Sequence, residues 1–199
     1  MLLALEGVDG SGKTTQAHLL ASALKKRLRL EVILTREPTL GPAGKRLRRY
    51  LAGSIRYLSP DAELTLFLED RREHVAQVIR PALAAGQVVI TDRYYYSSVA
   101  YQGALGLDPA LILATNEAFA PRPQVVFILT LPLELALVRL SRNSARPRQV
   151  SEGRDYLEKV AAIYASLTGP HIYRVDATGP PEIVHATLLE ITLNALKPD

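Results

Sequence analysis

A glycine-rich segment near the start of the chain has the residue types and spacing needed to hold a phosphate chain. Gly7, Gly12, Lys13 and Thr14 satisfy the pattern G-x-x-x-x-G-K-[ST] directly after the aliphatic run Leu2–Glu6. Glycines let successive backbone N–H groups turn inward around phosphate oxygens, and the N-terminus of a following helix adds partial positive charge. The lysine supplies a point charge for the terminal phosphates, and the threonine hydroxyl can bind Mg²⁺. We expect ATP with Mg²⁺ to be bound by Gly7, Val8, Asp9, Gly10, Ser11, Gly12, Lys13, Thr14 and Thr15.

A carboxylate follows a later apolar run. Gln87–Asp92 is apolar until Asp92, which would lie beside the glycine-rich segment if the sheet is wound as is usual for such motifs. Asp92 is therefore a candidate partner of the magnesium ion, together with Thr14. The alternative is a structural one, in which Asp92 caps a helix that begins near Tyr94.

Three arginines are expected to converge from separate elements. Arg36 ends the run Glu31–Arg36, Arg93 follows Asp92, and Arg48 lies on the helical segment after Arg36. Arg93 could face the phosphates or form a structural ion pair. Three converging guanidinium groups would suit one additional phosphoryl group better than they would suit a polynucleotide.

Two pairs of side chains could recognise a flat base. Phe67 and Arg71 stand four residues apart on a predicted helix and hence on one face, where a ring could stack and a guanidinium could donate. Tyr101 and Gln102 offer a ring and an amide after Asp92. The alternatives are that the rings belong to the core and that Arg71 is a solvated charge.

A basic segment follows the fourth aliphatic run. Between residues 139 and 154 it contains five arginines: Arg139, Arg142, Arg146, Arg148 and Arg154. Such a segment is either a solvated surface or a short lid that closes over the transferring phosphates and supplies an arginine in the transition state.

The elements that must position these residues alternate along the chain. The aliphatic runs are Leu2–Glu6, Glu31–Arg36, Gln87–Asp92, Val125–Leu131 and His171–Val175, and segments with helical spacing separate them. The longest such segment starts at Ser59-Pro60 and closes at Gly86. This alternation predicts an α/β fold with a five-stranded parallel sheet and helices on both faces, and 199 residues suit one domain.

Composition narrows the possible functions. The chain has no cysteine, which excludes disulfides and thiolate zinc sites, and its four histidines lack metal-ligand spacing. It has neither a secretory signal nor an apolar run long enough to span a membrane, so we expect a cytoplasmic protein without a membrane partner. The net charge of +4 allows an anionic partner. The clusters at 25–29 and 45–49 are the best evidence for a nucleic-acid-binding ATPase, but they fit solvated helix faces.

The sequence resembles the thymidylate kinases, P-loop nucleoside monophosphate kinases, from end to end. The resemblance rests on residues 5–16, on Thr35-Arg36-Glu37-Pro38, on Phe67 with Arg71, on Asp92-Arg93-Tyr94 and Ser97, and on Ala100-Tyr101-Gln102-Gly103. It implies a single-domain P-loop NTPase fold over residues 1–199 with a lid at about 139–154, and a homodimer. It also implies phosphoryl transfer from MgATP to dTMP, giving dTDP and ADP in dTTP synthesis.

The resemblance assigns roles around dTMP. It places Asp9 near the 3′-hydroxyl of the sugar, Tyr101 where a ribose 2′-hydroxyl would lie, and Ser97 among the dTMP contacts. The dTMP phosphate is expected to bind Arg36, Arg48 and Arg93.

Thymine is expected to stack on Phe67. The resemblance has Arg71 donate to the carbonyl at position 4, while Gln102 completes the base edge. Cytosine carries an amino donor at position 4 and would leave the guanidinium unpaired.

The catalytic cations implied by the resemblance are Lys13, Arg93 and a lid arginine. The variable positions of the phosphate loop, residues 8–11, include no basic residue, so the lid must supply one, with Arg142 and Arg146 as candidates. The sequence departs from the family pattern just after the lid, at residues 148–152. A role for Glu152 therefore stays open.

Two alternative functions remain beside this one. The first is a kinase of another nucleoside monophosphate or of a deoxynucleoside, although the three arginines favour an acceptor that already carries a phosphate. The second is a P-loop ATPase that binds nucleic acid, which would require a continuous basic stripe.

Overall fold

The strands form a single parallel sheet. The structure is a computed structural model that describes residues 1–53, 57–142 and 153–197. Its strands are β1 (Leu2–Glu6), β2 (Val32–Arg36), β3 (Val88–Asp92), β4 (Val125–Thr130) and β5 (Ile172–Asp176). They are hydrogen-bonded in the order β2-β3-β1-β4-β5. Every aliphatic run is confirmed as a strand, and its ends lie within one residue of the predicted ones.

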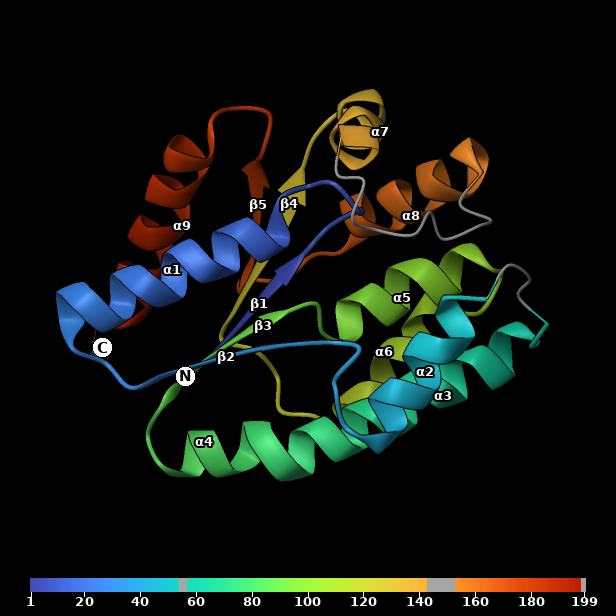
Figure 1. Ribbon diagram of the computed structural model, residues 1–199, viewed down its shortest axis with the longest axis horizontal. Helices are drawn as coiled ribbons and strands as arrows, with labels where there is room; N and C mark the ends of the chain where they lie inside the picture. The colour runs from blue at the N-terminus through green and yellow to red at the C-terminus, as the bar shows by residue number, and fades with distance from the viewer. Residues whose placement is uncertain (54–56, 143–152, 198–199) are drawn as a thin grey trace.

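Helices cover both faces of this sheet (Figure 1). They are α1 (Lys13–Leu28), α2 (Pro42–Leu51), α3 (Pro60–His74), α4 (Arg80–Ala84), α5 (Tyr95–Ala104), α6 (Pro109–Glu117), α7 (Leu133–Arg142), α8 (Arg154–Ser166) and α9 (Pro181–Ala195). The expected fold class is confirmed, because a doubly covered parallel sheet is the architecture of P-loop NTPases.

The two faces of β1 bury their side chains in two separate cores. Leu3 and Leu5 pack in a cluster with residues of α1 and α9, whereas Leu2 and Ala4 pack in a cluster with residues of α4, α5 and α8. All of these side chains are fully buried. A central strand covered on both faces needs apolar residues at every position, which explains why β1 reads as a continuous aliphatic run.

The long predicted helix is present but changes its winding. Ser59 caps α3 by accepting a hydrogen bond from the backbone N–H of Ala62, and α3 continues through a π-helical turn, η1 (Val75–Ile79), into α4. Pro81 has no N–H for the helical ladder and would clash with the carbonyl four residues earlier in an α-helix, so a wider turn just before it relieves the conflict. Gly86, with φ 73°, ends the segment as predicted.

Among the described residues, no helix is both long enough and apolar enough to cross a membrane.

Candidate active site

The glycine-rich segment forms a tight loop at the carboxyl end of β1. Gly7 has φ 131° and Gly10 has φ 81°, a backbone region that side chains disfavour. A Cβ on Gly7 would lie 2.5 Å from the carbonyl oxygen of Leu129, and one on Gly10 would lie 2.4 Å from that of Ala136. The loop is therefore pressed against β4 and α7, and only glycine fits at these two positions.

Lys13 is held inside this loop. Its Nζ donates to the backbone oxygens of Gly7 (3.0 Å) and Val8 (2.8 Å) and lies 3.4 Å from the hydroxyl oxygen of Ser11. Burial, followed by the like charge of Arg93, lowers the pKa of Lys13 to about 8. The loop thus holds an ammonium group whose partners are neutral oxygens, which leaves its charge available to an anion.

Thr14 and Asp92 meet beside the loop. The Thr14 hydroxyl on α1 donates to Asp92 Oδ2 on β3 at 2.5 Å. Oxygen ligands of this kind suit Mg²⁺, which usually binds one or two protein oxygens together with phosphate oxygens. The described residues include no cluster of three or more His, Cys, Asp or Glu that could hold a metal by itself. The donor set therefore fits a magnesium ion that arrives with a nucleotide.

Glu6, rather than Asp92, caps α5. Glu6 Oε1 accepts hydrogen bonds from the backbone N–H groups of Tyr94 (2.8 Å) and Ser97 (3.2 Å), at the first turn of α5. Its Oε2 accepts from the hydroxyls of Ser97 (2.6 Å) and Tyr164 (2.9 Å). Burial raises the pKa of Glu6, although these hydrogen bonds oppose the shift. This cap leaves Asp92 to face the phosphate loop.

Arg93 lies between the loop and α5 in a left-handed conformation, with φ 74°. Its Nη2 is 2.8 Å from Asp9 Oδ1 and 3.2 Å from the Tyr101 hydroxyl, and its Nη1 donates to the Ser97 hydroxyl at 3.0 Å. The guanidinium carbon also lies 5.0 Å from the centre of the Tyr101 ring. Arg93 therefore forms an ion pair, which was the structural alternative for this residue. It also borders the cavity that the phosphate loop lines.

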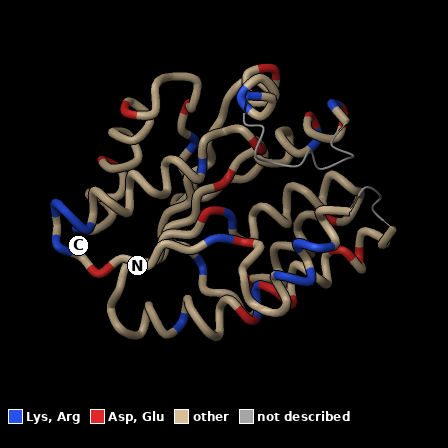
Figure 2. The backbone as a smooth tube through the Cα atoms, in the orientation of Figure 1, with Lys and Arg blue, Asp and Glu red and all other residues tan. Residues whose placement is uncertain are grey.

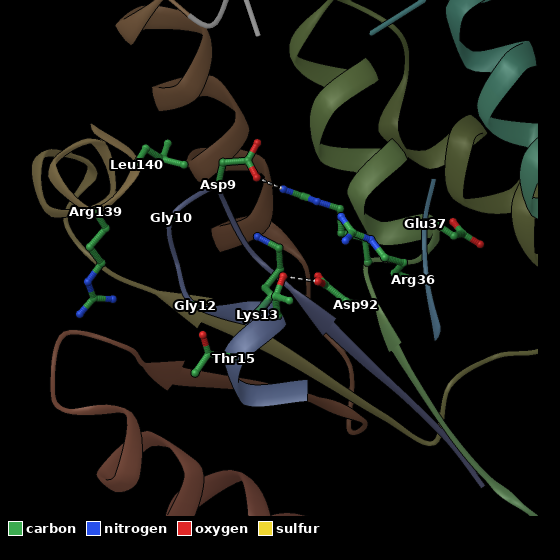
Figure 3. Close-up of a pocket in the computed structure, with 12 residues that line it drawn as sticks. Asp9, Gly10, Gly12, Lys13, Thr15, Arg36, Glu37, Asp92, Arg139 and Leu140 are labelled. Carbon is green, nitrogen blue, oxygen red and sulfur yellow. Dashed lines mark hydrogen bonds and ion pairs between the residues drawn. The ribbon is translucent and has the colours of Figure 1, made fainter. Parts of the chain in front are cut away.

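That cavity has a volume of about 350 Å³. Figure 3 shows residues that line it, among them Asp9, Lys13 and Asp92. The residues lining it are Asp9, Gly10, Gly12, Lys13, Thr14, Thr15, Arg36, Glu37, Asp92, Arg93, Arg139 and Leu140. The structure thus brings most of the predicted phosphate-binding residues to one space.

Arg36 and Arg48 differ in how they are held. Arg36 is exposed at the end of β2 and lines the cavity, whereas Arg48 on α2 donates from Nε to the backbone oxygen of Thr39 (2.9 Å) and from Nη2 to that of Pro38. Burial, and then the nearby positive charge of Arg36, lowers the pKa of Arg48. Two cations close enough to repel each other are favourably placed for an anion.

Arg71 is not a solvated charge, so that alternative was wrong. Its side chain is 1% exposed, and Nε and Nη2 donate to Glu37 Oε2 at 2.9 and 2.6 Å. Nη1 donates to the Ser98 hydroxyl (3.1 Å) and to Asn116 Oδ1 (2.7 Å). His74 Nδ1 lies 3.0 Å from the other Glu37 oxygen. Although burial acts to raise it, the pKa of Glu37 is lowered because Arg71 and His74 favour the carboxylate.

The other residues predicted to lie near the base are on α3 and α5. Phe67 is half-buried on α3, one turn before Arg71. Gln102 on α5 is buried, and its Nε2 donates to Glu63 Oε1 at 3.0 Å. Tyr101 is half-buried beside Arg93. None of Phe67, Arg71 and Gln102 lines the cavity described above, so the structure separates the base-side residues from the phosphate-side residues.

The basic segment is described only in part. Arg139 donates from Nη1 to the backbone oxygen of Ala177 (2.9 Å) and from Nη2 to that of Thr178 (3.1 Å). Arg142 is exposed at the end of α7. Arg146 and Glu152, with the rest of the segment from 143 to 152, lie outside the described residues.

The exposed basic cluster at 25–29 lies at the far end of α1. A helix of 16 residues is about 24 Å long, which separates this cluster from the phosphate loop where α1 begins. Figure 2 shows it near the labelled C-terminus, away from the other basic residues. The predicted basic clusters therefore lie on separate helices, 25–29 at the end of α1 and 45–49 on α2.

Sequence reasoning missed three buried carboxylates that hold the site together: Glu6, Glu37 and Glu63. Two of them could have been identified from the sequence, because Glu6 is the last residue of β1 and Glu37 directly follows β2. Glu63 precedes Phe67 by four residues and so shares its helix face. Nothing local in the sequence signals the partners Ser98, Asn116 and Tyr164.

Comparisons with known proteins point to one family. The family described as "Thymidylate kinase" matches residues 5–188. A thymidylate kinase from Xanthomonas campestris is 42% identical over 201 residues, which cover 99% of this chain and 86% of that protein. One from Desulfotalea psychrophila is 42% identical over 176 residues, or 88% of this chain and 86% of that protein. One from Xanthomonas oryzae is 42% identical over 203 residues, covering 100% and 87%. The matches thus include both the phosphate loop and the base-side helices.

Proposed function

The chain belongs to the thymidylate kinase family, and from that premise we propose how its residues divide the work of phosphorylating dTMP. It is an ATP-dependent nucleoside monophosphate kinase that converts dTMP and ATP to dTDP and ADP. One observation carries the proposed division of roles. The phosphate loop lines the same cavity as Arg36 at the end of β2 and Arg93 just after β3, so a donor and an acceptor phosphate would share one space.

The donor phosphates would bind in the loop. Backbone N–H groups of residues 7–15 and the N-terminus of α1 would face the phosphate oxygens, with Lys13 close to the terminal phosphates. The neutral oxygens that hold Lys13 support this role, because they orient the ammonium group without neutralising it.

Thr14 and Asp92 would hold Mg²⁺, directly or through water. When bound, the ion would offset charge on the β- and γ-phosphates. The Thr14 hydroxyl donates to Asp92, so the two oxygens lie side by side.

The acceptor phosphate would bind Arg36, Arg48 and Arg93. The lowered pKa of Arg48, caused by burial and by Arg36, supports an anion site between these two side chains. Asp9 would orient Arg93 through their ion pair and accept a hydrogen bond from the 3′-hydroxyl of the sugar. Ser97 would act through Arg93 and Glu6, which its hydroxyl contacts.

The thymine ring would lie between α3 and α5. Phe67 would stack on it, Arg71 would donate to its carbonyl at position 4, and Gln102 would meet the adjacent edge. Tyr101 would fill the space that a ribose 2′-hydroxyl needs. The hydrogen bonds that join Arg71 to Ser98 and Gln102 to Glu63 across α3 and α5 support the roles of Arg71 and Gln102.

The transfer needs little covalent chemistry from the protein. The acceptor phosphate is an anionic nucleophile, so no general base is required, and positioning with charge neutralisation supplies the rate. Lys13, Arg93 and a lid arginine, Arg142 or Arg146, would surround the transferring group. We also propose a cytoplasmic homodimer that makes dTDP for dTTP synthesis, in which residues 139–154 form the lid.

The substrate assignment is tested with a coupled assay that supplies MgATP and a panel of nucleoside monophosphates. We expect dTMP to be the best acceptor, followed by dUMP, which presents the same base edge. Faster turnover of UMP or CMP than of dTMP would contradict the proposed base contacts.

A further inference from the structure

Two stripes of side chains face each other across the base-side helices. Glu63, Phe67 and Arg71 stand at intervals of four residues on α3, and Ser98 and Gln102 stand four residues apart on α5. Glu63 Oε1 accepts from Gln102 Nε2 at 3.0 Å, and Arg71 Nη1 donates to the Ser98 hydroxyl at 3.1 Å. On α3, Glu63 lies one turn before Phe67 and Arg71 lies one turn after it, so the two contacts stand on either side of Phe67. A ring stacked on Phe67 would therefore lie between them.

The contact with Glu63 decides which way the Gln102 amide points. The NH₂ group of Gln102 donates to Glu63, so the carbonyl oxygen of the amide must point the other way. That oxygen, Oε1, is buried and has no hydrogen-bond partner among the described residues. A buried acceptor without a donor is unfavourable, so the site favours a ligand that brings a donor to it.

The carboxylate is itself held in place. Tyr50 on α2 donates its hydroxyl to Glu63 Oε2 at 2.7 Å, and Glu63 is 1% exposed. Each carboxylate oxygen thus has a partner on a different helix, α2 or α5. This arrangement restrains the carboxylate against rotation, and the Gln102 amide with it.

Arg71 supplies the complementary group. Of the five N–H groups of its guanidinium, four have partners in the part of the chain that the structure describes, which leaves one N–H on Nη2. The two side chains therefore offer a donor from Arg71 and an acceptor from Gln102. Thymine and uracil carry the matching pair at neighbouring atoms, the carbonyl at position 4 and the N3–H. Cytosine carries the reverse pair, an amino group and a bare N3.

We propose that Glu63 is a positioning residue for base selection. By fixing the Gln102 amide with its oxygen toward the base, it makes Gln102 an acceptor for N3–H and an unfavourable neighbour for cytosine N3. The inference rests on the proposed function of this site, and it assigns the discrimination against cytosine to a carboxylate that does not touch the base.

Glu63→Gln tests the proposal with almost no change in volume. The new amide can accept from or donate to Gln102, so the Gln102 amide can turn and present NH₂ to the base. We expect the ratio of kcat/KM for dTMP to that for dCMP to fall about tenfold or more, mainly through KM, while KM for ATP is unchanged. The ratio for dTMP to dUMP should stay constant, because both bases present the same edge.

Two further measurements separate this role from a structural one. Glu69→Gln is the matched control, since Glu69 lies on α3 but is exposed and pairs with Arg46 on the surface, and it should leave both ratios unchanged. Tyr50→Phe removes one hydrogen bond to Glu63 and should shift the dTMP to dCMP ratio in the same direction by a smaller factor. An equal loss for all three nucleotides in Glu63→Gln would overturn the proposal. Failure of the unaltered enzyme to use dTMP would instead overturn the proposed function.

Discussion

The charged side chains at the carboxyl edge of the sheet face a cavity, whereas those between α3 and α5 face one another. Lys13, Arg36 and Arg93 all border open space, and the direct partners of Lys13 are neutral oxygens. Arg71, by contrast, is fully buried with Glu37 and neutral acceptors. Although Arg93 pairs with Asp9, the phosphate side thus keeps the charge of Lys13 in reserve, and the base side balances its charge internally.

The chemistry of the ligand explains this contrast. A phosphate chain brings several negative charges and needs an excess of cations that no carboxylate has cancelled. A thymine ring is neutral, so a buried excess charge beside it would be unfavourable, and recognition depends on the direction of hydrogen bonds instead. Changes on the phosphate side should therefore affect rate, and changes on the base side should affect stability and selectivity.

The largest expected effect is that of Lys13→Ala. Removing the ammonium group takes away a preorganised charge beside the transferring phosphate, so kcat should fall about 1,000-fold. The free energy of unfolding should change little, because desolvation of the buried ammonium offsets its hydrogen bonds. Steady-state kinetics measure kcat, and urea unfolding measures the free energy of unfolding. Lys45→Ala, at an exposed residue of α2, is the control for both measurements. A decrease in kcat of less than tenfold would show that Lys13 is not a catalytic residue.

The second prediction concerns Glu37→Gln, which alters the carboxylate that pairs with Arg71 and also lines the cavity. It leaves the Arg71 guanidinium buried without a counter-charge, so the free energy of unfolding should fall by about 3 kcal/mol. Glu69→Gln breaks an exposed ion pair with Arg46 and should cost less than about 1 kcal/mol. Urea unfolding of both variants measures the difference. Equal destabilisation would mean that the buried pair has no special role.

The smallest expected effect is a dependence on pH. The pKa of Lys13 is lowered to about 8, so the ammonium form dominates below that pH and the neutral amine above it. The neutral form attracts phosphates less, and kcat/KM for ATP should fall about twofold at pH 8 and about tenfold at pH 9 relative to pH 6.5. A profile measured at saturating dTMP checks this. Lys13→Arg should lack this alkaline decline, because a guanidinium stays charged over the whole range.

The strands and the phosphate loop could be predicted because their signals are local. A central strand must be apolar along its length, and the loop motif is contiguous, so both are visible in the chain between Leu2 and Thr14. The strand-end position of Arg36, Asp92 and Arg93 followed from the rule that carboxyl ends of parallel strands share one edge.

The environment of Arg71 could not be predicted in the same way. Its partners Glu37, Ser98 and Asn116 lie 34, 27 and 45 residues away and belong to three different segments. No spacing rule relates such distant positions, so the sequence could not distinguish a solvated guanidinium from a buried one. The π-helical turn η1 was also missed, because the helical spacing between Ser59 and Gly86 does not distinguish a π-helical turn from an α-helix.

Strand β1 is the first strand to be made, and both of its neighbours in the sheet follow much later in the chain. Its neighbours in the sheet, β3 and β4, begin at residues 88 and 125, and the hydroxyl that completes the contacts of Glu6 belongs to Tyr164. At a synthesis rate of roughly 5–20 residues per second, the apolar residues of β1 wait on the order of ten seconds for cover. The phosphate loop that follows β1 takes its final form only when most of the chain has left the ribosome. An unfinished chain therefore carries the nucleotide motif without displaying a formed nucleotide site.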